Sequence, residues 1–430
     1  LRGSNVDNNM ITSVLANNAV GDALTITKSD GGVWVLNPTS ANTFTGAINS
    51  NGGLLGLTAN GLGTATALNL NNGGIFAYGT PLTISALVQG NNSTAIFAGQ
   101  NSITVNADVR KTAGNNQWTI SNNLEGGALL TINGNFVNQE AGATAATQTI
   151  SLRGFGSWLW NGSIGENAAA GGKTAWNIAI HPDAYFEMQG AANTYTGVTT
   201  LAQGTLILNK NVGVSPLGST SGLNWGGGVI QGGISLTGGS SINTPITLNG
   251  DPVIFSGSNS INLNAATAIT LTAARQLINN LSGGALTISG NISATAALTF
   301  NGPSNTTVSG QVTGAAGAVT MAGTGILALT NLATATGALT ASRGTMSLEG
   351  AAGAWGSGTV TLNTNGTLKL DNSVTNNNNR LFDTGAITMQ GGTLHLVGNG
   401  TTETAGAMTV NGIMGQILMT GSGSNTLSFG

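Results

Sequence analysis

The chain contains no cysteine among its 430 residues, which excludes disulfide bonds and thiolate metal sites. Charged residues are also scarce, at 6% of the chain, whereas ordinary soluble domains have roughly a quarter. The 11 lysines and arginines are scattered along the sequence, and binding to nucleic acid needs a basic patch or stripe. We therefore expect no nucleic-acid partner, and an anionic membrane surface is disfavoured for the same reason.

Long apolar runs are missing as well. No stretch approaches the ~18 consecutive apolar residues of a membrane-spanning helix, so we expect no membrane insertion by this segment. The N-terminal residues LRGSNVDNNM lack the apolar core of a signal peptide, which suggests a mature product or an excised segment. With 7 prolines and no long run of like charge, no linker is visible. We expect one continuous domain over residues 1–430.

Glycine is abundant, with 68 residues, and it recurs in a pattern. The pattern is a glycine, six residues, a second glycine, and then apolar residues at alternate positions. Residues 193–209, NTYTGVTTLAQGTLILN, show it with Gly197, Gly204, Leu206 and Leu208. Further copies contain Gly46, Gly53, Leu55 and Leu57; Gly310, Gly317, Val319 and Met321; and Gly337, Gly344, Met346 and Leu348. We interpret the glycines as turn residues and the alternating apolar residues as the inward face of the next strand.

Short alternating runs such as ITVNADV, ALTISGNI and TVTLNTNGTLKL fill the rest of the chain. Alternation bounded by Gly and Asn predicts half-buried strands, and helical spacing is almost absent. The copies have no fixed long period, which favours a β-helix over a sandwich or propeller. With ~20 residues per coil and strands ~4.8 Å apart, the sequence predicts an all-β, parallel β-solenoid of roughly twenty coils, forming an elongated rod about 100 Å long.

A single coil cannot fold alone. Its few small apolar side chains contribute less free energy than the ordering of ~20 residues costs. Neighbouring coils must therefore stabilise one another through backbone hydrogen bonds. Asparagine-rich turns are expected to add amide ladders between coils.

Residues 193–209, with Leu217 and Gly218 behind them, resemble the autotransporter-associated β-strand repeat of bacterial surface proteins. The copies near residues 42, 305 and 337 are progressively weaker matches. The resemblance implies a right-handed parallel β-helix that is exported across the bacterial outer membrane to the cell surface or the extracellular space. It implies almost nothing about activity.

Candidates for catalysis are few. Among 14 acidic residues, the pair Asp183 and Glu187 alone lies within four positions, whereas polysaccharide-cleaving β-helix enzymes use carboxylates close together. Stacked coils can nevertheless bring distant acids together. His395, in TLHLV, is expected to point outward from a strand, and His181, before a proline, to lie in a turn. We expect a non-catalytic protein without cofactor or metal.

One segment, at about 139–192, departs from the regular texture and is rich in aromatic residues. It has two interpretations: a wider coil whose core the rings fill, or a contact surface, since Trp, Tyr and Arg anchor interfaces and aromatic faces stack on sugar rings. The candidate contact residues are Arg153, Trp158, Trp160, Trp176, Asp183 and Tyr185.

These features together predict an extracellular, non-catalytic solenoid with a structural or adhesive role. Its partner would be a protein or glycan on a host or neighbouring cell, or the chain itself in head-to-tail or lateral association. The alternative is a subunit of a polymerising extracellular fibre or sheath, because the last residues, GQILMTGSGSNTLSFG, read as strand that another chain could continue. A viral tail fibre and a polysaccharide-degrading enzyme are less favoured.

Overall fold

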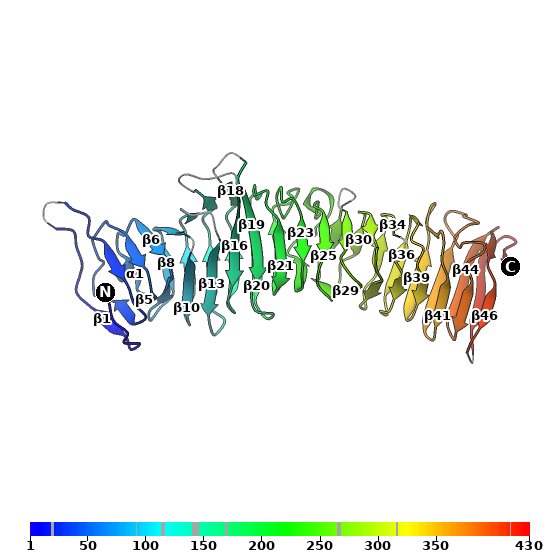
Figure 1. Cartoon of the computed structure of the whole chain (residues 1–430), viewed down its shortest axis with the longest axis horizontal. Coiled ribbons are helices and arrows are strands. Elements are labelled where there is room, and N and C mark those ends of the chain that lie inside the picture. The colour runs from blue at the N-terminus through cyan, green and yellow to red at the C-terminus, as the bar shows by residue number, and fades with distance from the viewer. Residues whose placement is uncertain are drawn as a thin grey trace. The chain divides into compact units, whose positions relative to one another are not determined.

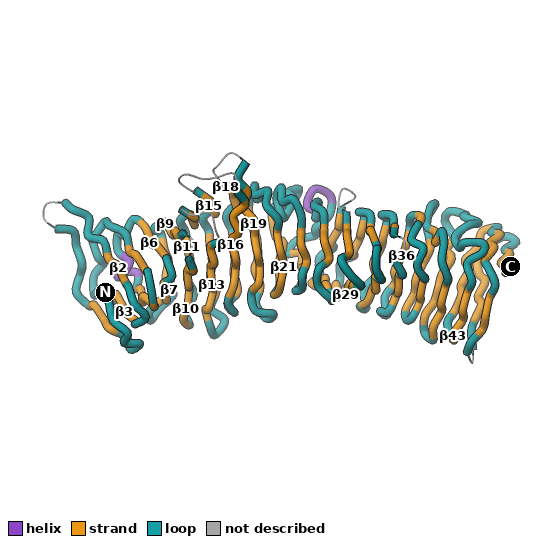
Figure 2. Tube along the Cα trace, viewed as in Figure 1, coloured by secondary structure: helices purple, strands orange, loops and turns teal. Residues whose placement is uncertain are grey.

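The computed structural model describes residues 1–18, 21–91, 93–112, 117–139, 146–167, 171–264, 268–314, 317–412 and 414–430. The fold is all-β, with parallel strands stacked as a β-solenoid of about 17 turns, compared with the roughly twenty expected. In the described ranges, helix is confined to α1 (Ala59–Leu62) and the 3₁₀ turn η1 (Gly238–Ser240), drawn in purple in Figure 2. No helix there has the length and apolar character that crossing a bilayer requires. The predicted fold class is confirmed.

The described residues form two compact units, Leu1–Ser221 and Gly222–Gly430. In the first unit, the chain visits three parallel sheets in turn and adds one strand to a sheet at each visit (Figure 1). Sheet A contains β1 (Asn9–Ile11), β3 (Val33–Leu36), β5 (Gly53–Leu57), β7 (Gly73–Ala77), β10 (Thr94–Gly99), β13 (Trp118–Leu124), β16 (Thr147–Arg153), β19 (Lys173–Ala179) and β21 (Thr199–Gln203). Sheet B contains β2 (Ile26–Lys28), β4 (Ile48–Ser50), β6 (Ala67–Leu70), β9 (Leu87–Gly90), β12 (Val109–Lys111), β15 (Phe136–Asn138) and β18 (Ile164–Asn167). Sheet C contains β8 (Leu82–Ile84), β11 (Ile103–Val105), β14 (Leu129–Ile132), β17 (Ser157–Trp160), β20 (Tyr185–Gly190) and β22 (Thr205–Lys210).

The second unit repeats this plan with its own strands. One sheet contains β23 (Leu223–Trp225), β25 (Ile246–Leu248), β28 (Ile269–Leu271), β31 (Ile292–Ser293) and β34 (Val312–Thr313). Another contains β24 (Val229–Gly232), β26 (Val253–Gly257), β29 (Arg275–Leu281), β32 (Leu298–Asn301), β35 (Val319–Met321), β38 (Leu339–Ala341), β41 (Val360–Asn363), β43 (Ile387–Gln390) and β46 (Met408–Val410). The third contains β27 (Ile261–Leu263), β30 (Leu286–Ile288), β33 (Thr306–Val308), β36 (Ile326–Leu329), β39 (Gly344–Leu348), β42 (Gly366–Asp371), β44 (Thr393–Asn399) and β47 (Gln416–Ser422). Two smaller pairs are β37 (Leu332–Ala333) with β40 (Ala354–Trp355) and β45 (Thr402–Ala405) with β48 (Thr426–Phe429).

The parallel register places like side chains above one another, so each turn continues the core of the last. Phe186 of β20 lies beside Leu206 of β22. Leu206 and Leu208 are both 0% exposed, whereas Ile207 between them is half-buried on the outer face. The predicted inward and outward positions of this strand are confirmed.

The glycine pattern has two structural causes. A Cβ on Gly197 would lie 2.3 Å from the carbonyl oxygen of Thr174 in the neighbouring turn, so this position has no room for a side chain. Gly204 has a φ of +86° and lies at the corner between β21 and β22, where L residues are strained. The first glycine therefore permits close stacking of turns, and the second one turns the chain from one sheet to the next.

Asparagine side chains form hydrogen-bonded ladders along the outside of the first unit. The Asn133 amide donates to Asn106 Oδ1 at 2.7 Å, and the Asn161 amide donates to Asn133 Oδ1 at 2.7 Å. A second step joins Asn69 to Asn49 at 2.6 Å. The expected amide ladders between turns are therefore present.

Candidate functional site

The three predicted tryptophan contacts lie in the core of the first unit. Trp158, Trp160 and Trp176 are 1%, 0% and 1% exposed. Trp160 and Trp176 meet edge to face at 5.7 Å, and Trp176 stacks on Phe186 at 6.5 Å. Trp158 and Trp160 do share one strand face, as their spacing predicts, but that face points inward because Ser157 and Leu159 occupy the outer one.

Rings without exposed surface cannot touch a partner, so the contact-surface interpretation is wrong for these three tryptophans. The rings fill the core instead. Over about 139–192, strands β16 to β20 continue the stack through the described part of the segment, but the pairings β15–β18 and β19–β21 each contain a register shift. Residues 140–145 and 168–170 lie outside the described residues.

The remaining predicted contacts, Arg153, Asp183 and Tyr185, do lie on the surface. Arg153 ends β16 and is exposed, Asp183 is exposed in the turn before β20, and Tyr185 begins β20 and is half-buried. All three lie at the corner where the chain passes from sheet A to sheet C. Arg153 belongs to one turn of the solenoid, and Asp183 and Tyr185 belong to the next. The structure therefore brings these three residues to the same corner.

Three further side chains share this corner: Glu125 in the turn after β13, Phe155 in the turn after β16, and His181 after β19. We call the six residues Glu125, Arg153, Phe155, His181, Asp183 and Tyr185 the corner surface. The sequence analysis did not select Glu125, Phe155 and His181 as contact residues, because the residues beside them at this corner come from other turns of the solenoid. Two glycines in a row at 126 and 127 mark the tight turn at Glu125 and were the available signal.

A groove of about 430 Å³ runs along the corner surface. Its lining residues come from three successive turns: residues 124–129, 155–157 and Tyr185. Phe155 is 47% exposed, and the Ser157 hydroxyl accepts a hydrogen bond from the Tyr185 backbone N–H at 3.3 Å. Aromatic rings, a carboxylate and hydroxyl groups are thus available side by side.

Glu125 lines the groove, and the same corner of the solenoid also carries the exposed Arg153, His181 and Asp183. His181 Nδ1 lies 3.6 Å from Asp183 Oδ2, and these side chains are 53% and 94% exposed. Such exposed pairs contribute little stability. Because the Asp183 backbone N–H also donates to His181 Nδ1 at 3.3 Å, the contact orders the turn more than it stabilises the fold.

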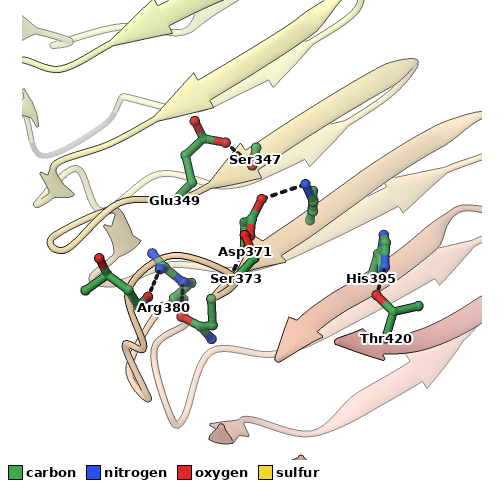
Figure 3. Close-up of polar contacts among 10 residues, drawn as sticks. Ser347, Glu349, Asp371, Ser373, Arg380, His395 and Thr420 are labelled. Atoms are coloured by element: carbon green, nitrogen blue, oxygen red, sulfur yellow. Dashed lines mark hydrogen bonds and ion pairs between the residues drawn. The ribbon is translucent and has the colours of Figure 1, made fainter. Parts of the chain in front are cut away.

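The second unit gathers a separate group of charged side chains around Asp371, shown in Figure 3. Lys369 Nζ lies 2.6 Å from Asp371 Oδ2, and the Ser373 hydroxyl donates to Asp371 Oδ1 at 2.6 Å. Burial raises the pKa of Asp371, but the hydrogen bonds from Lys369 and Ser373 outweigh it and bring the pKa down to about 2. This carboxylate stays ionised at neutral pH.

Next to it, the buried Arg380 fastens a loop to the solenoid (Figure 3). Its guanidinium donates to Asn372 Oδ1 at 2.7 Å and to the carbonyl oxygens of Gly353 and Gly350 at 2.6 and 2.9 Å. Glu403 accepts hydrogen bonds from the backbone N–H groups of Arg380 and Leu381. Burial raises the pKa of Glu403 and lowers that of Arg380.

Stacking therefore brings together acids that are far apart in the sequence. Glu349 and Asp371 line one pocket of about 250 Å³, and Glu349 Oε2 accepts a hydrogen bond from Ser347 at 2.7 Å. General acid catalysis needs a carboxyl whose pKa lies near the working pH, and Asp371 is far below it. Its bonds to Lys369 and Ser373, each two residues away in the same turn, hold the end of β42 in place.

His395 stands on the outer face of β44, as its alternation predicts, and its Nε2 lies 2.8 Å from the Thr420 hydroxyl. His181 lies next to a turn, also as predicted. Within the described ranges, no three His, Asp or Glu side chains are arranged to hold a metal ion.

A scan against protein-family models finds no match for this chain, and neither the curated proteins nor the solved structures contain a match.

Proposed function

We propose that the chain is a non-catalytic structural and adhesive solenoid that is displayed on a bacterial surface or secreted. The corner surface is its contact region, and its partner is a protein or glycan on a host or neighbouring cell. In this proposal the chain reaches the outside by export across the outer membrane, as its resemblance to autotransporter repeats suggests.

The observation that carries the proposal is the composition of the corner surface. In a chain with 6% charged residues, successive turns of the solenoid bring Glu125, Arg153 and Asp183 to the same corner as the exposed Phe155 and the half-buried Tyr185. Aromatic and Arg side chains at the centre of a patch carry most of the binding energy at protein interfaces. The outer faces of nearby strands, by contrast, present mainly Thr, Asn and Ser, which bind water well.

A binding assay with a corner variant tests this proposal. The triple variant Arg153→Ser, Asp183→Ser, Tyr185→Ser removes the predicted contacts, and none of these side chains is buried in the core. We expect surfaces coated with the variant to capture far fewer cells than the unmodified protein does. The melting temperature should stay nearly unchanged, because little buried area is lost.

The matched control is Arg2→Ser, Asp22→Ser, Tyr78→Ser, which removes the same residue types elsewhere in the first unit, with the same classes of exposure. This control should capture cells as well as the unmodified protein. Equal capture by the corner variant and the control would contradict the proposal.

A further inference from the structure

We propose that the groove on the corner surface binds a saccharide, with one face of a sugar ring lying against Phe155. This inference rests on the proposed recognition function and names the class of ligand. Phe155 lines the groove and is 47% exposed. Among the described residues its ring contacts no other ring, and the C–H face of a pyranose is apolar enough to cover the apolar surface that it exposes.

Other residues that line the groove carry hydrogen-bonding groups that lack protein partners. Glu125 and Tyr185 both line the groove, and neither the Glu125 carboxylate nor the Tyr185 hydroxyl makes a hydrogen bond or ion pair with the described residues. The backbone N–H groups of Gly126 and Gly127 are also without a partner there. Residues that carry free acceptors and donors thus line the same groove, which suits sugar hydroxyls because each hydroxyl both donates and accepts.

Backbone geometry keeps the turn at Glu125 in place. Gly126 and Gly127 have φ values of +64° and +81°, so the tight turn needs glycine at both positions. The Ala128 N–H closes the turn on the Glu125 carbonyl at 3.0 Å, and the Glu125 N–H binds the Gly99 carbonyl at 2.8 Å. A preformed site loses less conformational entropy when a ligand binds.

Size and charge narrow the class of ligand. A groove of about 430 Å³ lies in the range of small-molecule sites, roughly 300–1,000 Å³, and can hold a short oligosaccharide. The carboxylate of Glu125 repels anions, so phosphorylated and sulfated ligands are disfavoured. The same corner also carries the exposed, cationic Arg153, which disfavours basic peptides. A neutral saccharide fits both conditions.

Isothermal titration calorimetry with the full chain tests the inference. The probes are maltotriose, cellotriose and N,N′,N″-triacetylchitotriose, with an oligolysine peptide as the competing class. We expect at least one of the three sugars to bind, and the lysine peptide to bind more weakly. Phe155→Ala and Glu125→Gln should each weaken the binding of that sugar by about tenfold, a loss typical of one aromatic or charged contact.

Phe382→Ala is the matched control, because Phe382 lies in the second unit and is 44% exposed, close to the exposure of Phe155. This variant should bind the sugar as tightly as the unmodified chain does. No binding by any of the three sugars, or equal loss in the Phe382 variant, would overturn the inference. Tighter binding of the lysine peptide than of every sugar would do so as well.

Cell capture separates this inference from the proposed function. If the corner variant loses cell capture while the unmodified chain binds no sugar, the recognition function stands and the saccharide inference fails. If a sugar binds at Phe155 but cells are not captured, the groove is a saccharide site and the adhesive function fails.

Discussion

At the scale of the residue, the register of β22 decides which substitutions the fold tolerates. Leu206→Asp would place an unpaired charge at a position with no exposure, and we expect it to lower the free energy of unfolding by at least ~4 kcal/mol. Ile207→Asp lies on the outer face and should cost less than about 1 kcal/mol. Urea unfolding of both variants measures the difference. Equal costs would mean that the strand is shifted by one residue.

The buried tryptophans give a second prediction at this scale. Replacing Trp158 and Trp160 together by Ser should lower the free energy of unfolding by at least ~4 kcal/mol, because large aromatic residues in a core cost about 3–5 kcal/mol each when truncated. Differential scanning calorimetry should show a large fall in melting temperature. Phe155→Ser, at an exposed ring, is the control and should melt almost as the unmodified chain does. An unchanged melting temperature in the double variant would contradict the core position of these rings.

The buried Lys210 makes stability depend on pH. Its Nζ donates to the carbonyl oxygens of Gly162 and Gln189, and burial lowers its pKa from 10.5 to about 8. Between these two values the unfolded chain binds a proton that the folded chain has released, so stability rises with pH. Burial raises the pKa of Tyr195. Above about pH 10 this phenol therefore loses its proton in the unfolded chain but keeps it in the folded chain, so the increase of stability with pH ends there.

We therefore expect the free energy of unfolding to increase by about 1–3 kcal/mol between pH 8 and pH 10. Chemical denaturation at several pH values measures this slope. Lys210→Met removes this titrating group and should remove most of the slope over the same interval, while Lys28, whose pKa burial also lowers, contributes the rest. An unchanged slope in the variant would assign it to a group other than Lys210.

At the scale of the element, glycine sets how closely two turns stack. Gly197→Ala would place a methyl group 2.3 Å from the Thr174 carbonyl oxygen, so the turns must move apart. We expect a loss of about 1–3 kcal/mol in the free energy of unfolding. Gly31→Ala is the control, because a Cβ there meets nothing within 4 Å. Equal stability of the two variants in urea would show that stacking at Gly197 is loose.

Strands and turns were predictable at this scale because their signals are local. Alternation identified Leu206 and Leu208 as inward residues, and the structure confirms it. The direction of the Trp158 and Trp160 face was not predictable in the same way. Two aromatic residues at alternate positions define one face of a strand, but the neighbouring turns decide whether that face is the core or the surface. Phe136 and Phe186, from other turns, pack against Trp160 and decide it.

At the scale of the whole molecule, stability is expected to be local, because each turn packs on its neighbours. Leu206→Asp should therefore raise amide hydrogen exchange most strongly in β19–β22. Strands β2–β6 of the same unit are several turns away and should change little. Mass spectrometry of peptides from both regions measures the contrast. A uniform increase would indicate that the first unit unfolds as one cooperative block.

The sequence alone determined the fold class, the inward face of aliphatic strands such as β22 and the positions of tight turns, because alternation and glycine act over a few residues. It also placed Arg153, Asp183 and Tyr185 among the surface candidates. Tertiary structure decided what lies beside them. Glu125 and Phe155 join the same groove, and Glu349 shares a pocket with Asp371, because stacked turns align residues that are 20 to 30 positions apart by roughly one strand spacing. The length of each turn sets those alignments, and no local pattern encodes it.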